Sequence, residues 1–415
     1  MYFTYTFILA LGLVLTFPYY LVRFRKYLPT MADRLGSLKI PQLRRAIWVH
    51  AVSVGEVKAV EQLLERLRQQ FPEKPLVVST ATPTGQQVAH ARSDIVDHTF
   101  YFPIDIPWCV RRAVERVDPE MVIIAETEIW PNFLRACRRR GVRVVMINGR
   151  ISDRSFSRYR LVRRWLRRVF EDYTMIGMQS ERDRQRIEAI GADPRKVTVL
   201  GNLKYDAVAS TRNVENALAS LLIRWNPLWI AASTMPGEEE LVLDAFGQVL
   251  NMHPGLKLLI APRHAERFEA VAEIIKGRGL EMVRRTQLIS GNSPVLLLDT
   301  IGELAALFQY ATVVFIGGSL VPTGGHNVLE PARQSKPIVF GPHMENFRDM
   351  VRLFLETNAA IQIQSANQLA PAISNLLSNP QHASDLGRAA FAVVQQNTGA
   401  TDRVLQILEP VEAPR

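Results

Sequence analysis

Two stretches of the chain decide the fold: AIWVHAVSVGE at residues 46–56 and LWIAASTMPGEEE at residues 228–240. Both run from an apolar strand through small polar residues into Gly-Glu and the start of a helix pattern. Apolar strands that alternate with helices predict a parallel sheet covered by helices on both faces. Because the pattern restarts at residue 228, we expect an α/β protein with two doubly wound, Rossmann-like domains facing a cleft.

Each of these stretches is followed by further strand patterns of the same kind. The first series continues at residues 76–85, 121–131, 142–150 and 197–206, and the second at residues 256–264, 294–300, 311–319 and 336–342. The join between the two series falls within residues 206–220. We therefore place the first domain at residues 23–210 and the second at residues 211–415, with residues 1–22 as a separate segment.

The composition is that of an ordinary globular protein. The 415 residues are 47% hydrophobic and 22% charged, and a chain of this length builds cores without a disulfide or a metal. The two cysteines, Cys109 and Cys137, form no CxxC motif and no Cys/His cluster. We therefore exclude a disulfide-stapled secreted module and a structural zinc site, and we expect a reducing compartment such as the cytoplasm.

The first 22 residues contain no charged side chain. At about 1.5 Å per residue, a helix of this length spans roughly 30 Å of hydrocarbon. The first cations, Arg23, Arg25 and Lys26, follow the apolar run, whereas a signal peptide carries its charge before it. We expect a single membrane anchor with the rest of the chain on the cytoplasmic side. The alternative is a helix on the bilayer or docked on the protein, since three threonines and Pro18 dilute the apolar run.

The net charge of +10 is unevenly distributed. Residues 1–207 hold 34 Lys and Arg against 21 Asp and Glu, a net +13, and residues 208–415 hold 16 against 19, a net −3. A basic half favours a polyanion, either nucleic acid or an anionic membrane with acidic lipid substrates. Seven arginines between residues 154 and 168 alternate with apolar residues at helical spacing, which is typical of a helix against anionic headgroups. A solvated surface helix is the alternative.

The second series contains a pattern that suggests a nucleotide site. In FIGGSLVPTGGHNVLEPA, residues 315–332, the glycines let the backbone approach a ligand, and a helix opening at His326-Asn327 would offer amides to an anion. Glu330 could accept both hydroxyls of a ribose. The spacing matches neither the dinucleotide fingerprint nor the P-loop. The alternative is a glycine turn with a capping Asn and a Glu that complements the helix dipole.

Four charged residues stand at the ends of predicted strands. Arg263, after Pro262, could hold a phosphate or carboxylate, and Lys204 in GNLKYD lies similarly. Glu56 and Glu126 could each serve as a general base where burial raises the pKa, or could simply begin a helix. No catalytic triad, HExxH motif or carboxylate cluster can be argued, so we expect no metal and no cofactor.

These motifs together closely resemble those of the 3-deoxy-D-manno-oct-2-ulosonic acid (Kdo) transferases of lipopolysaccharide synthesis. The resemblance runs over nearly the whole chain after a hydrophobic N-terminus. Its motifs are RLG (34–36), HAVSVGE (50–56), TPTG (82–85), ETEIWPN (126–132), NGRIS (148–152), GNLKYD (201–206), PRH (262–264), GGSLVPTGGHNVLEP (317–331) and GPHMENF (341–347). The resemblance implies GT-B architecture, with an acceptor-binding first domain and a second domain that binds a CMP-sugar.

The resemblance also implies an activity and roles for residues. Kdo would pass from CMP-Kdo to a hydroxyl of the lipid A precursor, lipid IVA, with inversion and without a metal. Glu56 matches the proton acceptor, and Glu126 and Lys204 match positions of transition-state stabilisation. The CMP-binding segments match Pro262, Arg263, Ile301, Gly302, Glu303, Asn327, Val328, Leu329 and Glu330, although the family often has Met at Ile301 and Pro at Val328.

The implied partners are the CMP-Kdo donor, the lipid A precursor and an anionic membrane surface, and the implied location is the bacterial inner membrane. Nucleic acid is not expected, because only Tyr159, Trp165 and Phe170 interleave aromatic rings with the basic run. Two alternatives stay open. One is another GT-B enzyme with a different nucleotide sugar, and the other is a membrane-anchored nucleotide- or RNA-binding protein without catalysis.

Overall fold

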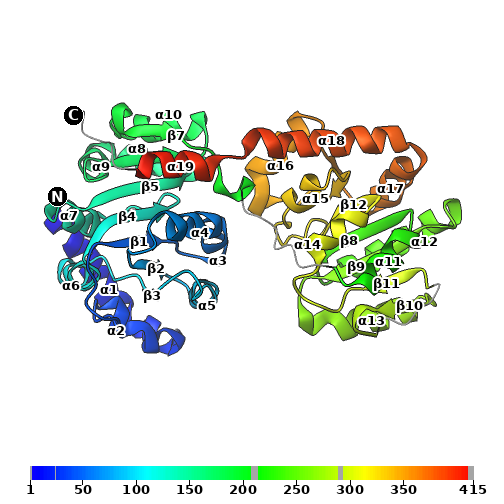
Figure 1. Cartoon of the computed structure of the whole chain (residues 1–415), viewed down its shortest axis with the longest axis horizontal. Helices are drawn as coiled ribbons and strands as arrows, with labels where there is room; N and C mark the ends of the chain where they lie inside the picture. Colours follow the sequence, from blue (N-terminus) through cyan, green and yellow to red (C-terminus); the bar gives the residue numbers. More distant parts are fainter. Residues whose placement is uncertain (1, 24, 207–213, 288–292, 410–415) are drawn as a thin grey trace. The chain divides into compact units, whose positions relative to one another are not determined.

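A computed structural model describes residues 2–23, 25–206, 214–287 and 293–409. The chain forms two compact units, Met1–Ala207 with Asn397–Arg415 (unit 1) and Val208–Gln396 (unit 2) (Figure 1). The described residues of each unit form one seven-stranded sheet in which every strand pair is parallel. The prediction of two Rossmann-like α/β domains is therefore confirmed.

The sheet of unit 1 has the order β3-β2-β1-β4-β5-β6-β7. Its strands are β1 (Ala46–His50), β2 (Leu76–Thr80), β3 (His98–Tyr101), β4 (Pro119–Ala125), β5 (Arg143–Gly149), β6 (Met175–Met178) and β7 (Val197–Val199). The order of strands reverses between the neighbours β1 and β4. Ligands of doubly wound sheets bind outside the carboxyl ends of the strands at such a point.

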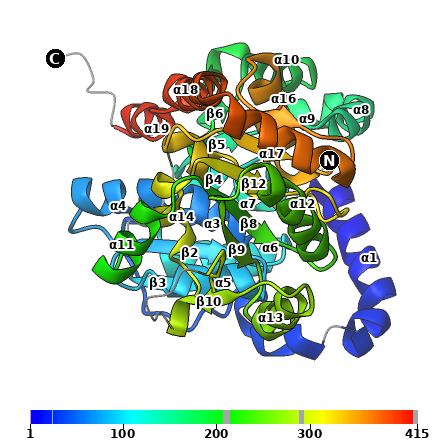
Figure 2. The same cartoon turned by 90° about the vertical axis from the view of Figure 1, so that its right-hand side faces the viewer.

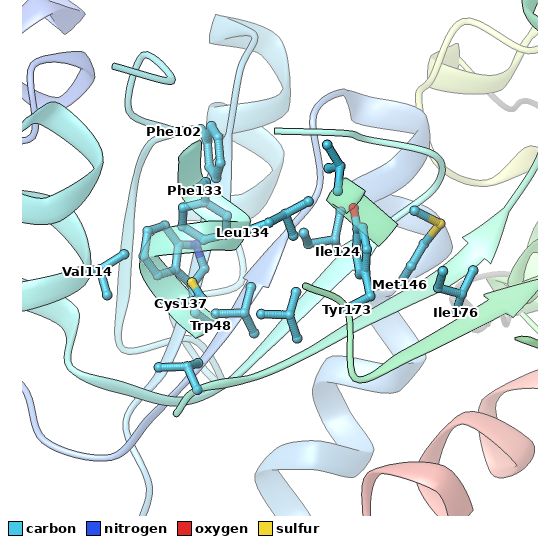
Figure 3. Packing of buried hydrophobic residues seen from close by; sticks show 14 of the residues in the cluster. Trp48, Phe102, Val114, Ile124, Phe133, Leu134, Cys137, Met146, Tyr173 and Ile176 are labelled. Carbon is cyan, nitrogen blue, oxygen red and sulfur yellow. The ribbon is translucent and has the colours of Figure 1, made fainter. Parts of the chain in front are cut away.

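Helices cover both faces of this sheet. They are α3 (Val54–Ala59), α4 (Glu61–Gln70), α5 (Pro83–His90), α6 (Pro107–Val117), α7 (Pro131–Arg139), α8 (Asp153–Leu161), α9 (Arg163–Phe170), α10 (Glu181–Ala189) and α19 (Ala400–Leu408). Successive residues of β1 point to opposite faces: Trp48 packs in one apolar cluster with Phe133, and Ile47 and Val49 pack in the other. Figure 3 shows the Trp48 cluster, which includes the free and buried Cys137.

The sheet of unit 2 has the order β10-β11-β9-β8-β12-β13-β14. Its strands are β8 (Leu228–Thr234), β9 (Lys257–Pro262), β10 (Met282–Arg284), β11 (Val295–Leu297), β12 (Val313–Ile316), β13 (Ile338–Phe340) and β14 (Ile361–Gln362). Its helices are α11 (Asn216–Arg224), α12 (Glu238–Met252), α13 (Phe268–Gly277), α14 (Leu304–Leu307), α15 (Leu329–Arg333), α16 (Arg348–Glu356), α17 (Leu369–Ser378) and α18 (Pro380–Asn397).

The end of the chain corrects the predicted second domain. Residues 211–415 were expected to form one domain, but the segment from residue 397 onward belongs to unit 1. The reason is apolar packing: Val404, Leu405 and Leu408 of α19 are buried in the same cluster as Leu63 and Leu64 of α4. No local pattern distinguishes this amphipathic helix from one that would pack on unit 2.

The N-terminal apolar segment forms a helix, α1 (Tyr2–Arg23), drawn in blue in Figure 2. Among the helices of the described residues, none is both long and apolar enough to cross a membrane, so the predicted spanning anchor at residues 1–22 is not confirmed. Hydroxyl groups dilute the apolar run and form hydrogen bonds with side chains elsewhere in unit 1. The Tyr2 hydroxyl donates to Asp172 Oδ2 (2.6 Å), and Asn132 Nδ2 donates to Thr6 Oγ1 (3.0 Å).

The packing of α19 predicts that a cavity in its apolar face destabilises unit 1. Leu408 is 2% exposed, and replacing a buried Leu with Ala costs about 2–5 kcal/mol. We expect Leu408→Ala to unfold at lower denaturant concentration, whereas Ala at the exposed Gln406 of the same helix should have little effect. Equal unfolding midpoints for the two variants would contradict the assignment of α19 to this core.

Candidate active site

Glu56 stands in the first turn of α3, just after β1. Its Oε2 accepts a hydrogen bond from the backbone N–H of Val52 (2.7 Å), and its Oε1 accepts one from the hydroxyl of Ser53, the N-cap residue (3.0 Å). This arrangement is related to a capping box. It fixes the orientation of the carboxylate and leaves lone pairs on both oxygens, because an ionised carboxylate accepts about four hydrogen bonds.

The TPTG segment supports the Glu56 loop from the neighbouring strand. The backbone N–H of Ala81 donates to the carbonyl of Val52 (3.0 Å). Thr82 caps α5 by accepting from the N–H of Gly85 (3.1 Å). A Cβ on Gly85 would lie 2.8 Å from Thr82 Oγ1 and 3.3 Å from the carbonyl carbon of Ser53. Glycine is therefore needed for α5 to approach the loop this closely.

Glu126 follows β4 in a strained conformation. Its φ of 61° lies in the left-handed region, which a residue with a Cβ adopts at a cost of about 1–3 kcal/mol and which clusters at functional sites. Hydrogen bonds on both sides hold this loop: Glu126 N–H donates to the carbonyl of Ile147 (2.9 Å), and the Tyr173 hydroxyl donates to the carbonyl of Glu128 (2.7 Å). The turn places Glu126 beside a cation.

That cation is Lys204, in a short 3-10 helix, Leu203–Tyr205, that follows β7. Its Nζ lies 3.9 Å from Glu126 Oε1, and each side chain is about one-third exposed (33% and 32%). The buried Asn148 at the end of β5 accepts from the N–H of Leu203 (3.1 Å) and so fixes the start of this helix. The structure thus brings Glu126 and Lys204 together, although β5 and β6 lie between β4 and β7 in the sheet.

The charges of Glu126 and Lys204 also act on the pKa of Glu56. Burial raises the pKa of Glu56, and the negative charge of Glu126 raises it further. The hydrogen bonds from Val52 and Ser53 and the positive charge of Lys204 lower it. Glu56, Glu126 and Lys204 therefore form one charged group, in which Glu56 is a stronger base than an exposed glutamate.

A further carboxylate, Glu128, belongs to this group and was missed in the sequence. Burial, together with the charges of Glu56 and Glu126, raises the pKa of Glu128 to about 7. The signal was present in the sequence: the ETE motif comes directly after the apolar strand, so both of its glutamates would be expected near the carboxyl end of β4. Burial, which only the folded chain supplies, sets its pKa.

In unit 2, the three predicted nucleotide segments follow neighbouring strands of one sheet. Pro262 and Arg263 close β9, the segment Ile301–Glu303 follows β11, and Asn327–Glu330 follows the loop after β12. Since β11, β9, β8 and β12 are adjacent, all three segments lie at the carboxyl edge of the sheet. Asn327 Nδ2 donates to Glu330 Oε1 (3.0 Å), and Glu303 accepts from Arg285 (2.9 Å). The three segments thus follow strands of one sheet, and their role in binding CMP stays a prediction.

The glycine loop differs from the prediction. The helix α15 begins at Leu329 instead of His326, has five residues, and the N–H of Leu329 already donates to Asn327 Oδ1 (3.0 Å). The amides of the loop are also occupied. The buried Glu238 accepts from the N–H groups of Gly318 (2.5 Å), Ser319 (2.9 Å) and Leu320 (2.8 Å). The helix start expected at His326-Asn327 is therefore wrong, and Glu238 already holds the amides of residues 318–320; an anion at the amides near Asn327 stays a prediction.

The groups that could meet an anion at this edge are side chains instead. Arg263 is exposed and, within the described part of the chain, has no ion-pair partner. His326 faces Arg263 and His264, and burial together with these two neighbours lowers its pKa to about 4. His326 is therefore a neutral imidazole at neutral pH, and Arg263 supplies the positive charge. The described residues contain no group of three or more His, Cys, Asp or Glu arranged for a metal ion.

The sequence and fold of this chain resemble those of known proteins. A family model described as 3-deoxy-D-manno-octulosonic-acid transferase matches residues 30–207. The chain is 35% identical to the 3-deoxy-D-manno-octulosonic acid transferase of Haemophilus influenzae over 401 residues, which cover 94% of this chain and 93% of that protein. The chain belongs to the Kdo transferase family. The corresponding protein of Bordetella pertussis is 30% identical, with 92% and 91% covered.

Among solved structures, a UDP-N-acetylglucosamine 2-epimerase matches 90% of this chain and 99% of its own length, with a TM-score of 0.61 and 11% identity. At this identity the likeness concerns the fold alone, and it places this Kdo transferase family member among proteins of GT-B type. The enzyme class is that of the family: the chain is a glycosyltransferase.

The role of Glu238 predicts a local loss of protection in Glu238→Gln. An amide can turn only one oxygen toward the three N–H donors and adds donors of its own. Leaving a buried donor unsatisfied costs about 1–3 kcal/mol. We expect residues 318–320 to exchange amide hydrogen about 5- to 150-fold faster, measured by mass spectrometry. Gln at the exposed Glu266 is the control, and unchanged exchange in Glu238→Gln would refute the assignment.

Proposed function

We propose that this protein transfers Kdo from CMP-Kdo to a hydroxyl of the lipid A precursor, lipid IVA, with inversion at the anomeric carbon. The observation that carries the proposal is the Glu56 carboxylate, oriented by Val52 and Ser53 and electrostatically coupled to Glu126 and Lys204. A base held in this way suits the activation of a sugar hydroxyl, in a chain that belongs to the Kdo transferase family.

The chemistry follows from these groups. The acceptor oxygen attacks the anomeric carbon from the side opposite the phosphate, so the configuration inverts. As the new C–O bond forms, Glu56 takes the hydroxyl proton, and the bond between the anomeric carbon and the phosphate oxygen breaks with its electron pair leaving on CMP. A raised pKa improves Glu56 as a proton acceptor. Lys204, held beside Glu126, supplies positive charge for the negative charge that moves to the leaving group.

The edge of the sheet in unit 2 is the proposed donor site. The exposed guanidinium of Arg263 suits a phosphate, to which it can bind through two N–H groups. Glu330, oriented by Asn327, suits the two hydroxyls of a ribose. The segment Ile301–Glu303 carries Gly302 with a φ of 92°, a conformation that lets backbone groups approach a ligand. These roles rest on the family resemblance and on the shared sheet edge.

We also propose that the protein lies on the cytoplasmic surface of the bacterial inner membrane through unit 1. The apolar side chains of α1 that are exposed are Phe3, Phe7, Ile8, Leu11, Val14 and Leu15. The ring of Tyr5 in α1 lies 5.7 Å from that of Trp165 in the arginine-rich α9, and Leu161 beside it is 86% exposed. Apolar and cationic side chains on neighbouring helices suit the interface of an anionic bilayer.

The base assignment predicts the effect of Glu56→Gln. Glutamine keeps the size of glutamate but cannot accept the proton, so we expect transfer to fall by about 10²- to 10⁴-fold, with CMP binding retained. The measurement is turnover with CMP-Kdo and lipid IVA both saturating, beside Glu126→Gln. If Glu56→Gln keeps more than about a tenth of wild-type turnover while Glu126→Gln is inactive, the roles of the two carboxylates are reversed.

The membrane assignment predicts that polar residues on α1 weaken binding to anionic vesicles. Each buried apolar side chain contributes about 1.5–3 kcal/mol, so we expect Phe7→Ser with Ile8→Ser to reduce vesicle binding at least tenfold in a flotation assay. The matched control is Ile223→Ser, since Ile223 is 67% exposed but lies on α11 of unit 2. Equal binding of both variants would refute α1 as the contact surface.

A further inference from the structure

The segment that carries Lys204 is held by residues from the far end of the chain. Asp206, two residues after Lys204, is buried, and its carboxylate accepts from two backbone N–H groups at the start of α19. Oδ1 accepts from Gly399 (2.7 Å) and Oδ2 from Thr401 (2.5 Å). Charge-assisted hydrogen bonds of this kind at a helix N-terminus are strong and directional. The backbone two residues after the lysine is therefore tied to α19.

A second contact holds the residues before Lys204. Arg403 of α19 donates from Nε to the carbonyl of Leu200 (2.8 Å). Gly201 has a φ of +90°, and a Cβ at this position would lie 2.6 Å from Arg403 Nη2. The guanidinium thus lies directly against the backbone that leads into the Lys204 turn. Apolar side chains also join this segment to α19, because Leu200 and Leu203 are buried in the same cluster as Ala400 and Val404.

We propose that Asp206 is a positioning residue for Lys204, and that α19 in this way completes the active site of unit 1. Lys204 reaches Glu126 at 3.9 Å on a long, flexible side chain, so the direction of its backbone decides where the ammonium rests. Asn148 fixes one side of the turn from within the sheet, and α19 fixes the other. The inference rests on the proposed role of Lys204 in the transfer reaction.

Displacement of Lys204 would change the pKa of Glu56, whereas a loss of stability alone would not. The ionisable and polar groups that act on the pKa of Glu56 are Glu126, which raises it, and Lys204, Val52 N–H and Ser53 Oγ, which lower it; Glu128 is the other carboxylate of the group. If the ammonium moves away, the pKa of Glu56 rises. Because the base must be ionised to accept a proton, the acid limb of the rate profile then moves to higher pH.

The experiment measures the transfer rate of full-length variants over a range of pH, with lipid IVA saturating and CMP-Kdo varied up to saturation. In Asp206→Asn, an amide nitrogen faces one of the two N–H donors. We expect kcat to fall on the order of 10- to 100-fold, as for a small misplacement of a reacting group, with KM for CMP-Kdo within about twofold of wild type. The acid limb should move to higher pH, as it should in Lys204→Met.

Two controls separate position from stability. Asp402 lies on the same helix with its side chain 61% exposed, paired with Arg66 at 3.2 Å, so Asp402→Asn should change neither kcat nor the acid limb. Leu408→Ala lowers stability but leaves the Asp206 contacts, and its acid limb should remain in place below its unfolding temperature. If Asp206→Asn does not fold, Arg403→Lys, which keeps the charge but loses the Nε donor, takes its place.

The outcomes distinguish this inference from the proposed function. If Lys204→Met is impaired while Asp206→Asn has wild-type kcat and acid limb, α19 does not position the lysine and the inference is overturned. An upward shift of the acid limb in Leu408→Ala as large as in Asp206→Asn would also overturn it, because general loosening would then suffice. If Lys204→Met transfers Kdo at the wild-type rate, the proposed role of Lys204 is wrong.

Discussion

Buried or half-buried carboxylates that accept hydrogen bonds from backbone N–H groups hold the loops at the sheet edges of this protein. A loop at the edge of a sheet leaves backbone donors without strand partners, and a buried donor must be satisfied. Here Glu56 binds Val52, Glu238 binds the amides of residues 318–320, and Asp206 binds Gly399 and Thr401. The same device caps α7, where Asp105 accepts from Asn132 and Phe133. The loops are therefore ordered by acids that the chain supplies.

In unit 1 the same hydrogen bonds that hold the loop also affect the basicity of Glu56. The hydrogen bonds that fix Glu56 lower its pKa, whereas burial and Glu126 raise it. The opposed effects leave a carboxylate that is oriented and still basic. In unit 2 the corresponding glutamate after β8, Glu238, uses its oxygens on the glycine loop and is fully buried. Two openings of similar sequence thus differ in structure: the first glutamate is half-buried beside Glu126 and Lys204, and the second is fully buried against the glycine loop.

The fold itself leaves the reaction open. A nucleotide-sugar epimerase shares the two-unit GT-B architecture over 90% of this chain at 11% identity, so the layers and strand order are compatible with different chemistries. What distinguishes this chain is the set of side chains at the carboxyl edges of its sheets. In unit 1 these are three glutamates and a lysine, and membership of the Kdo transferase family follows from sequence similarity over almost the entire length.

The sequence by itself determined the two parallel sheets. Its apolar strands alternate with helices, and a parallel sheet with helices on both faces buries such strands. It also indicated that Glu56, Glu126 and Lys204 follow strands of the first sheet, and the fold then brought Lys204 to Glu126 across the width of β5 and β6. Only the tertiary structure decided that α19 returns to unit 1, that Glu128 joins the charged group, and that Glu238 occupies the amides of residues 318–320. Each of these depends on contacts between segments far apart in the chain, and local periodicity and composition carry no record of such contacts.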